Sequence, residues 1–198
     1  MASLYECEVR FFIEAISAFE KRLEVLGTRL IYPYEFNDHY FKPAPVLDNK
    51  WDPSEKNIRI REWKFPQNET TIYFSKNEVV SIDGVQFKRA LYPQGKVPLF
   101  RGDVNTCKSL LHDLGFSYWF TIEKQKARLW EIPEHGFKTA VEFIEGLGWC
   151  GELEFEGEDL LKAKADIERA LNILEIPKHL VSYEPLSVIF SKLVLGFI

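Results

Sequence analysis

Charged and apolar side chains alternate near the start of the chain, and this alternation constrains the fold more than any other feature. In residues 5–12, Glu6, Glu8 and Arg10 occupy every second position, with Cys7 and Val9 between them. Residues two apart in an extended strand lie on the same face. One face therefore carries two carboxylates and a guanidinium, and the other is apolar and is expected to pack into the protein. The charged face must then contact either water or the inside of a lined cavity.

Three later segments repeat this alternation. Their charged faces carry Arg59 and Arg61; Lys124, Lys126 and Arg128; and Glu152, Glu154 and Glu156. One such strand alone is typical of a sheet face in contact with water. Two mainly acidic and two basic rows on one exposed sheet would repel internally without benefit. We therefore expect the rows to face each other across a closed barrel, where they could hold a divalent metal and a polyanion together, with Glu156 at the surface.

Composition limits the classes of function. The chain has 198 residues and no evident linker, which predicts one domain over residues 1–198. A net charge of −5 argues against a general nucleic-acid-binding protein. The three cysteines are widely spaced and show no metal-ligand spacing, so we interpret them as reduced core residues of a cytoplasmic protein. No signal peptide and no membrane-spanning segment are expected, and a homodimer is compatible with the sequence but not specified by it.

Hydrophobic periodicity predicts an α+β protein in which antiparallel strands dominate and helices pack outside. Asp83-Gly84 is a strong hairpin signal, and Asp103 and Gly115 mark the ends of one helix. The expected helices cover residues 12–26, 103–114 and 160–174, with a short one after Pro185; the expected strands cover about 5–12, 29–41, 57–64, 70–76, 79–82, 85–87, 117–131, 137–145 and 149–156; and residues 42–56 form a loop.

These motifs, in this order, resemble the CYTH superfamily, also called triphosphate tunnel metalloenzymes, which includes class IV adenylyl cyclases and thiamine triphosphatases. The matching segments are Glu6-Cys7-Glu8-Val9-Arg10, Asp38-His39-Tyr40-Phe41, Arg59-Ile60-Arg61, Lys76, Leu114-Gly115-Phe116, Lys124-Gln125-Lys126-Ala127-Arg128, Glu142 with the Gly146-to-Glu154 segment, and Ser182-Tyr183. Together they span nearly the whole chain.

The resemblance implies an eight-stranded antiparallel β-barrel whose hydrophilic interior forms a triphosphate tunnel, with helices on the outside. Burying a triphosphate requires matching cations. The implied substrate-binding residues are Arg59, Arg61, Lys76, Lys124, Lys126 and Arg128. The implied ligands for Mg²⁺ or Mn²⁺ are Glu6, Glu8, Glu142, Glu152 and Glu154. The implied catalytic residues are Glu6, Glu8 and Arg10.

Three functions remain open at this point. A metal-dependent triphosphatase acting on ATP, thiamine triphosphate or inorganic triphosphate needs only water, metal and a clamped substrate. A class IV-type adenylyl cyclase would in addition hold adenine and form cyclic AMP and pyrophosphate. A non-catalytic polyphosphate-binding module is the third, because Arg10 stands where the family usually has lysine and arginine does not lose its proton. Phe36, where the family has glutamine, and a fifth strand without acidic residues are further departures.

Overall fold

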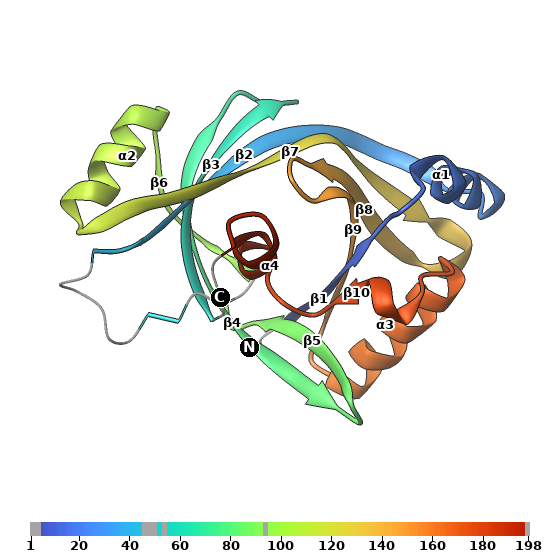
Figure 1. Ribbon diagram of the computed structural model, residues 1–198. Helices are drawn as coiled ribbons and strands as arrows, with labels where there is room; N and C mark the ends of the chain where they lie inside the picture. Colours follow the sequence, from blue (N-terminus) through green and yellow to red (C-terminus); the bar gives the residue numbers. More distant parts are fainter. Residues whose placement is uncertain (1–4, 45–50, 53–54, 93–94, 197–198) are drawn as a thin grey trace.

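The computed structural model describes residues 5–44, 51–52, 55–92 and 95–196, and it has an α+β fold built around one large antiparallel sheet. Within this part of the chain the sheet has ten strands, in the order β10-β1-β5-β4-β3-β2-β7-β8-β9, with β6 paired to β4. An additional pairing joins β1 to β9, so the strands from β1 round to β9 form a ring. Figure 1 shows this ring almost end-on, with α1, α2 and α3 outside it.

Most elements agree with the sequence prediction. The strands are β1 (Tyr5–Phe12), β2 (Arg29–Pro43), β3 (Lys56–Phe65), β4 (Thr70–Ile82), β5 (Val85–Ala90), β6 (Val97–Arg101), β7 (Phe116–Ile132), β8 (Phe137–Ile144), β9 (Gly148–Gly157) and β10 (Val181–Ser182). The helices are α1 (Ile16–Val25), α2 (Val104–Asp113), α3 (Leu160–Ile173) and α4 (Leu186–Leu193), with 3₁₀ turns at Pro133–His135 and Lys178–Leu180. Strands β6 and β10 were not predicted, and part of the predicted 42–56 loop lies outside the described residues.

Local sequence signals explain several boundaries. The carboxylate of Asp103 accepts hydrogen bonds from the backbone N–H groups of Asn105 and Thr106, both at 3.0 Å, and so caps α2. Asp83 and Gly84 both have positive φ, 50° and 79°, as the two-residue turn between β4 and β5 requires. Gly115 ends α2 with a φ of 83°, which an L-residue adopts only with strain.

Strand β1 separates its two kinds of side chain as its alternation predicts. Cys7, Val9 and Phe11 are fully buried and pack against α1 and α3, together with Phe19 and Ile167. Burying these apolar groups stabilises the outer layer and fixes the register of the strand, because a slip of one residue would exchange its faces. Glu6, Glu8 and Arg10 consequently point to the inside of the ring.

The predicted basic face of β7 is wrong beyond Lys124. Lys126 has a positive φ of 49°, and the pairing of β7 with β8 shifts register between Gln125 and Arg128. A bulge of this kind inserts an extra residue and breaks the two-residue alternation. Ala127 is therefore buried on the side where simple alternation predicts polar residues, whereas Lys126 is exposed and Arg128 pairs with Glu20 outside the ring at 2.8 Å.

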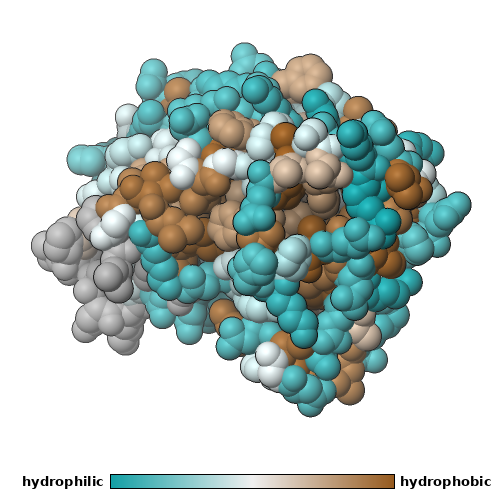
Figure 2. All heavy atoms as spheres, turned by 45° about the vertical axis from the view of Figure 1, so that its right-hand side comes forward, coloured by the Kyte–Doolittle hydropathy of each residue, from teal (hydrophilic) through white to brown (hydrophobic). Residues whose placement is uncertain are grey.

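The C-terminal helix α4 packs on the ring but not on its outer side, where the helices were expected (Figure 1). Leu186 and Phe190 join Tyr40, Phe120 and Ile144 in one hydrophobic cluster, and Figure 1 shows α4 within the outline of the ring. None of the helices in the described part of the chain has both the length and the apolar composition needed to cross a membrane. Figure 2 shows one face of the molecule, on which hydrophilic residues surround patches of hydrophobic ones.

Candidate functional site

A cavity of about 460 Å³ lies inside the ring, and charged residues from distant parts of the sequence line it. Strands β1, β3, β8 and β9 each contribute charged side chains. The N-terminal end of α4 contributes Leu186 and Ser187, and Pro185, which precedes the helix, also lines the cavity. Among the described residues, the lining cations are Arg10, Arg59, Arg61, Lys88, Lys96, Lys124 and Lys138, and the lining carboxylates are Glu6, Glu8, Asp38, Glu142, Glu152 and Glu154. The expected charged rows of β1 and β3, Glu152 and Glu154 of β9, and Lys124 of β7 therefore share one interior.

Arginines of β3 lie on one side of the cavity and are held by Asp38 of β2. The Arg61 guanidinium donates two hydrogen bonds to the Asp38 carboxylate, at 2.8 and 2.7 Å, and Arg59 Nε lies 3.2 Å from the same carboxylate. Burial alone would raise the pKa of Asp38, but Arg61 and Arg59 outweigh it and hold that pKa at about 2. Asp38 thus stays ionised and orients both guanidinium groups.

The aromatic ring of Phe36 makes cation–π contacts with two cations of the cavity, Arg61 and Lys124. The guanidinium carbon of Arg61 lies 3.8 Å from the centre of the Phe36 ring, and Lys124 Nζ lies 5.1 Å from it. Cation–π contacts of this kind stabilise a cation that has lost water. Arg59 Nε is buried and faces the Asp38 carboxylate without a hydrogen bond of good geometry in the described part of the chain, so the charge of Asp38 compensates for its burial.

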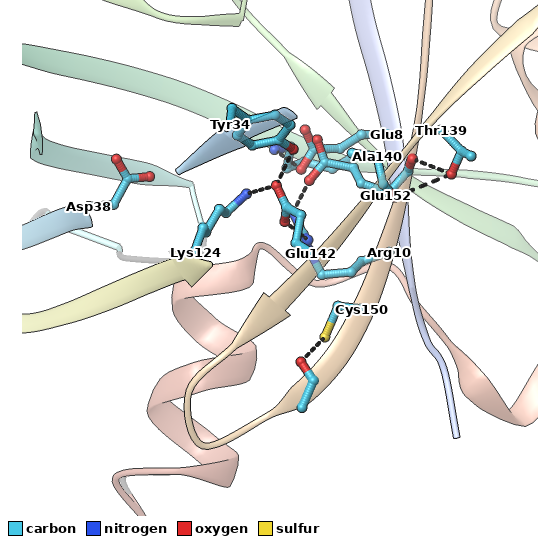
Figure 3. A network of polar contacts seen from close by, with 12 residues as sticks. Glu8, Arg10, Tyr34, Asp38, Lys124, Thr139, Ala140, Glu142, Cys150 and Glu152 are labelled. Atoms are coloured by element: carbon cyan, nitrogen blue, oxygen red, sulfur yellow. Dashed lines mark hydrogen bonds and ion pairs between the residues drawn. The ribbon is translucent and has the colours of Figure 1, made fainter. Parts of the chain in front are cut away.

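Glu142 of β8 is the centre of a buried network. It accepts hydrogen bonds from Tyr34 Oη at 2.5 Å, Lys124 Nζ at 2.8 Å and Arg10 Nη1 at 3.2 Å, and Figure 3 shows the three donors converging on it. Burial opposes ionisation of Glu142, but Lys124 and Arg10 lower its pKa to about 2. Arg10 also forms an ion pair with Glu152. Its guanidinium is therefore shared between two carboxylates.

The lowered pKa of Lys124 shows that this part of the cavity disfavours a further positive charge. Burial is the main cause that lowers the pKa of Lys124 to about 8, and repulsion from Arg10 and Arg61 adds to it, although Glu142 acts in the opposite direction. The same cations that hold Asp38 and Glu142 ionised therefore destabilise a further positive charge. An anion entering beside Arg59, Arg61 and Lys124 would relieve that repulsion.

Carboxylates gather in a different part of the cavity. Oxygens of Glu6, Glu8 and Glu154 all lie within 4.8 Å of one another. Burial raises the pKa of Glu154 to about 7, and the negative charges of Glu6 and Glu8 contribute to that rise. The pKa of Glu6 is raised for the same reasons, burial first and then Glu8. A group of mutually repelling carboxylates is stabilised by a cation placed between them.

The donor set of this cluster fits a hard divalent cation, since Mg²⁺ and Mn²⁺ prefer carboxylate oxygens. The other two expected ligands, Glu142 and Glu152, do not join the cluster, because each is paired with Arg10. Gly95 lies directly against the cluster: a Cβ at this position would lie 1.9 Å from Glu6 Oε2. The loop that precedes β6 thus approaches the carboxylates as closely as only glycine allows.

Three of the expected substrate-binding residues do not line the cavity. Lys126 and Arg128 are turned away by the bulge in β7, and Lys76 lies opposite Lys56 in the β3–β4 pairing while its neighbours Ser75 and Asn77 face inward. The lining residues that sequence reasoning missed include Asp38, Lys88 and Lys96. A signal existed for Asp38, which lies two residues from both Phe36 and Tyr40 and so shares one strand face with these two aromatic residues.

Comparisons with known proteins agree with this geometry. A family model described as "CYTH domain" matches residues 4–181. No curated protein matches the chain.

Solved structures with a similar fold include the following three. A conserved hypothetical protein from Pyrococcus furiosus is 21% identical, with a TM-score of 0.69, covering 91% of this chain and 97% of that one. A candidate adenylate cyclase from Vibrio parahaemolyticus is 12% identical, with a TM-score of 0.68 and coverage of 96% and 99%. A candidate adenylyl cyclase from Hippeastrum, described as having a dominant triphosphatase activity, is 16% identical, with a TM-score of 0.59 and coverage of 98% and 97%.

Proposed function

Since the chain belongs to the CYTH domain family, we propose that its ring is an eight-stranded triphosphate tunnel and that the protein is a divalent-metal-dependent triphosphatase. The observation that carries this proposal is the division of one cavity into two parts. Arg59, Arg61 and Lys124 lie in the cationic part, whereas the oxygens of Glu6, Glu8 and Glu154 meet within 4.8 Å elsewhere in the same cavity. A metal–polyphosphate complex has the matching charges.

The cationic part would hold the phosphate oxygens. Guanidinium groups bind phosphate through two parallel hydrogen bonds, and Arg59 and Arg61 point such groups into the cavity. Asp38 keeps the Arg61 fork in one orientation, which lowers the entropic cost of binding. Lys124 would act as a point charge beside them. Enclosure by the ring would exclude bulk water and strengthen each of these interactions.

The carboxylates Glu6, Glu8 and Glu154 would hold the metal ion. When bound, Mg²⁺ or Mn²⁺ neutralises charge on the phosphate oxygens and polarises the phosphorus centre toward attack by water. Glu6 and Glu8 on β1 and Glu154 on β9 lie on strands that pair directly, so the ligands sit on rigid elements. The structural neighbour described as having a dominant triphosphatase activity supports hydrolysis as the first reaction to test.

Arg10 gives the binding-only alternative a specific basis. Burial lowers the pKa of Arg10, but the negative charges of Glu142 and Glu8 outweigh it and raise that pKa. The guanidinium, which also pairs with Glu152, therefore stays charged and cannot take a proton from a nucleophile. Substitution of Arg10 by lysine separates the two functions. Increased turnover at unchanged triphosphate affinity would identify a tunnel that binds substrate with its chemistry suppressed; unchanged turnover would show that the position does not limit the reaction.

The decisive experiment identifies the product. The protein is incubated with inorganic triphosphate, thiamine triphosphate and ATP, each with Mg²⁺ or Mn²⁺, and we expect release of orthophosphate. Cyclic AMP together with pyrophosphate would establish a cyclase instead, and binding without any product would establish a binding module. The double variant Glu6→Gln/Glu8→Gln should abolish metal-dependent turnover, and full activity in that variant would remove both residues from the mechanism.

A further inference from the structure

A lysine occupies the carboxylate cluster. Lys88 of β5 pairs with the Glu8 carboxylate, and both side chains are mostly buried, with exposed fractions of 14% and 13%. The pKa values of Glu6 and Glu154 are raised by burial and by the neighbouring carboxylates, and the positive charges of Lys88 and Lys96 oppose that rise. An ammonium group therefore already neutralises part of the negative charge that would attract a metal ion.

Strand register fixes this lysine in place. Strand β1 lies between β5 and β9, and Glu8 is directly opposite Lys88 on one side and directly opposite Glu154 on the other. Like charges directly opposite each other in a sheet are destabilising, whereas opposite charges are favourable. The pair Glu8–Glu154 thus requires a cation nearby, and the β1–β5 register supplies one from the chain itself.

We propose that Lys88 is a resident cation of the carboxylate cluster and sets its affinity for divalent metal. The proposal rests on the metal site of the proposed function and adds a residue that controls it. A divalent ion that approaches Glu8 meets the Lys88 ammonium on the same carboxylate, so weakening or breaking that ion pair reduces the net binding free energy of the metal. The metal-free protein consequently binds divalent ions weakly.

Displacement of Lys88 also gives the lysine a second partner. Its ammonium lies in the same cavity as Arg59 and Lys124, where the oxygens of a bound polyphosphate would accept its hydrogen bonds. Metal and polyphosphate therefore favour each other: the metal frees a cation, and the anion provides the freed cation with a new acceptor. The metal is accordingly held more tightly together with the anion than without it.

The test measures Mn²⁺ binding to the metal-free protein, without substrate, by the loss of the free Mn²⁺ electron paramagnetic resonance signal. Lys88→Gln removes the resident cation and should bind Mn²⁺ about tenfold more tightly, which corresponds to the loss of one close charge contact. Lys88→Arg keeps the charge and should bind Mn²⁺ no more tightly than the wild type. Circular dichroism verifies folding, and Lys88→Met, similar in length to lysine, repeats the measurement if the glutamine variant unfolds.

A control variant separates the effect of the Lys88–Glu8 contact from the general effect of removing one positive charge. Lys126→Gln removes the same charge from an exposed lysine that the bulge in β7 turns away from the cavity, and should change Mn²⁺ affinity far less than Lys88→Gln. Equal tightening in both variants, or unchanged or weaker binding in Lys88→Gln, would overturn the role of Lys88. Glu6→Gln tests the site itself: if Mn²⁺ binding survives this change undiminished, the metal site of the proposed function is wrong, whatever Lys88 does.

Discussion

Arg59 and Arg61 owe their geometry to the residues that support them. Asp38 fixes the guanidinium of Arg61, and the Phe36 ring lies beneath it at 3.8 Å. The family glutamine that Phe36 replaces would offer hydrogen bonds instead of an aromatic face. In the sequence, Phe36 stands out only as the loss of a family glutamine. In the structure, its ring stabilises Arg61 and Lys124 through cation–π contacts.

We expect Arg61→Lys to weaken binding of inorganic triphosphate about tenfold, because lysine cannot form the paired hydrogen bonds of a guanidinium and has no flat face to stack on Phe36. Isothermal titration calorimetry measures the change. Arg128→Lys, on the same ring but paired with Glu20 outside the cavity, is the control and should bind like the wild type. Equal losses in both variants would contradict the assignment of Arg61.

Glu142→Gln tests the buried network through pH. The pKa of Glu142 is about 2 in the folded protein and 4.5 ordinarily, so its ionisation stabilises the fold above about pH 4.5, and this stabilisation is lost as the pH falls toward 2. We expect the variant to be less stable than the wild type by about 3 kcal/mol at pH 6, because Arg10 and Lys124 lose a buried partner. The difference should shrink at pH 3. Urea unfolding at both pH values measures it, and a constant difference would contradict the shift.

Among the elements, the strands followed sequence periodicity wherever their pairing is regular. The charged faces of β1 and β3 and the positions of Glu152 and Glu154 were predictable because one buried apolar face fixes the register. The prediction fails in β7 because a bulge at Lys126 has no signal of its own in sequence. Strand β6 was missed because four of its five residues are exposed, which leaves no alternation to detect.

Register between strands was the part that sequence could not provide. Lys88 is visible in the sequence as one cation of β5, but its position beside Glu8 depends on how β1 pairs with β5. Glu142 and Glu152 likewise lie outside the carboxylate cluster because Arg10 pairs with both of them. Alternation predicts which face a side chain occupies; it does not predict which residues of another strand it meets.

The close contact of β9 with β1 provides a test at the level of elements. A Cβ on Gly151 would lie 2.0 Å from Cζ of the fully buried Phe11, so Gly151→Ala should overpack this contact and lower the free energy of unfolding by about 1–3 kcal/mol. Chemical denaturation measures the loss. Gly157→Ala, also on β9, meets no atom within 4 Å in the described part of the chain and should be nearly neutral. Similar effects in both variants would indicate that propensity, and not the contact, controls stability.

For the whole molecule, closure of the ring is what turns charged strand faces into a site. Without the pairing of β1 with β9, Glu8 and Glu154 would not lie opposite each other, and the carboxylate cluster would not form. The helices contribute differently: α1 and α3 bury the outer face of β1, and α4 lines the cavity with its first residues. Most apolar residues therefore pack outside the ring and at its end, whereas the interior combines charged side chains with a few aromatic ones, among them Phe36.

The most direct measurement is diffraction from crystals grown with inorganic triphosphate and Mn²⁺, with the metal located by its anomalous signal. We predict a Mn²⁺ peak among the oxygens of Glu6, Glu8 and Glu154, and triphosphate density against Arg59 and Arg61. An interior that stays free of anion at saturating triphosphate, or Mn²⁺ bound only outside the ring, would contradict a triphosphate-binding cavity.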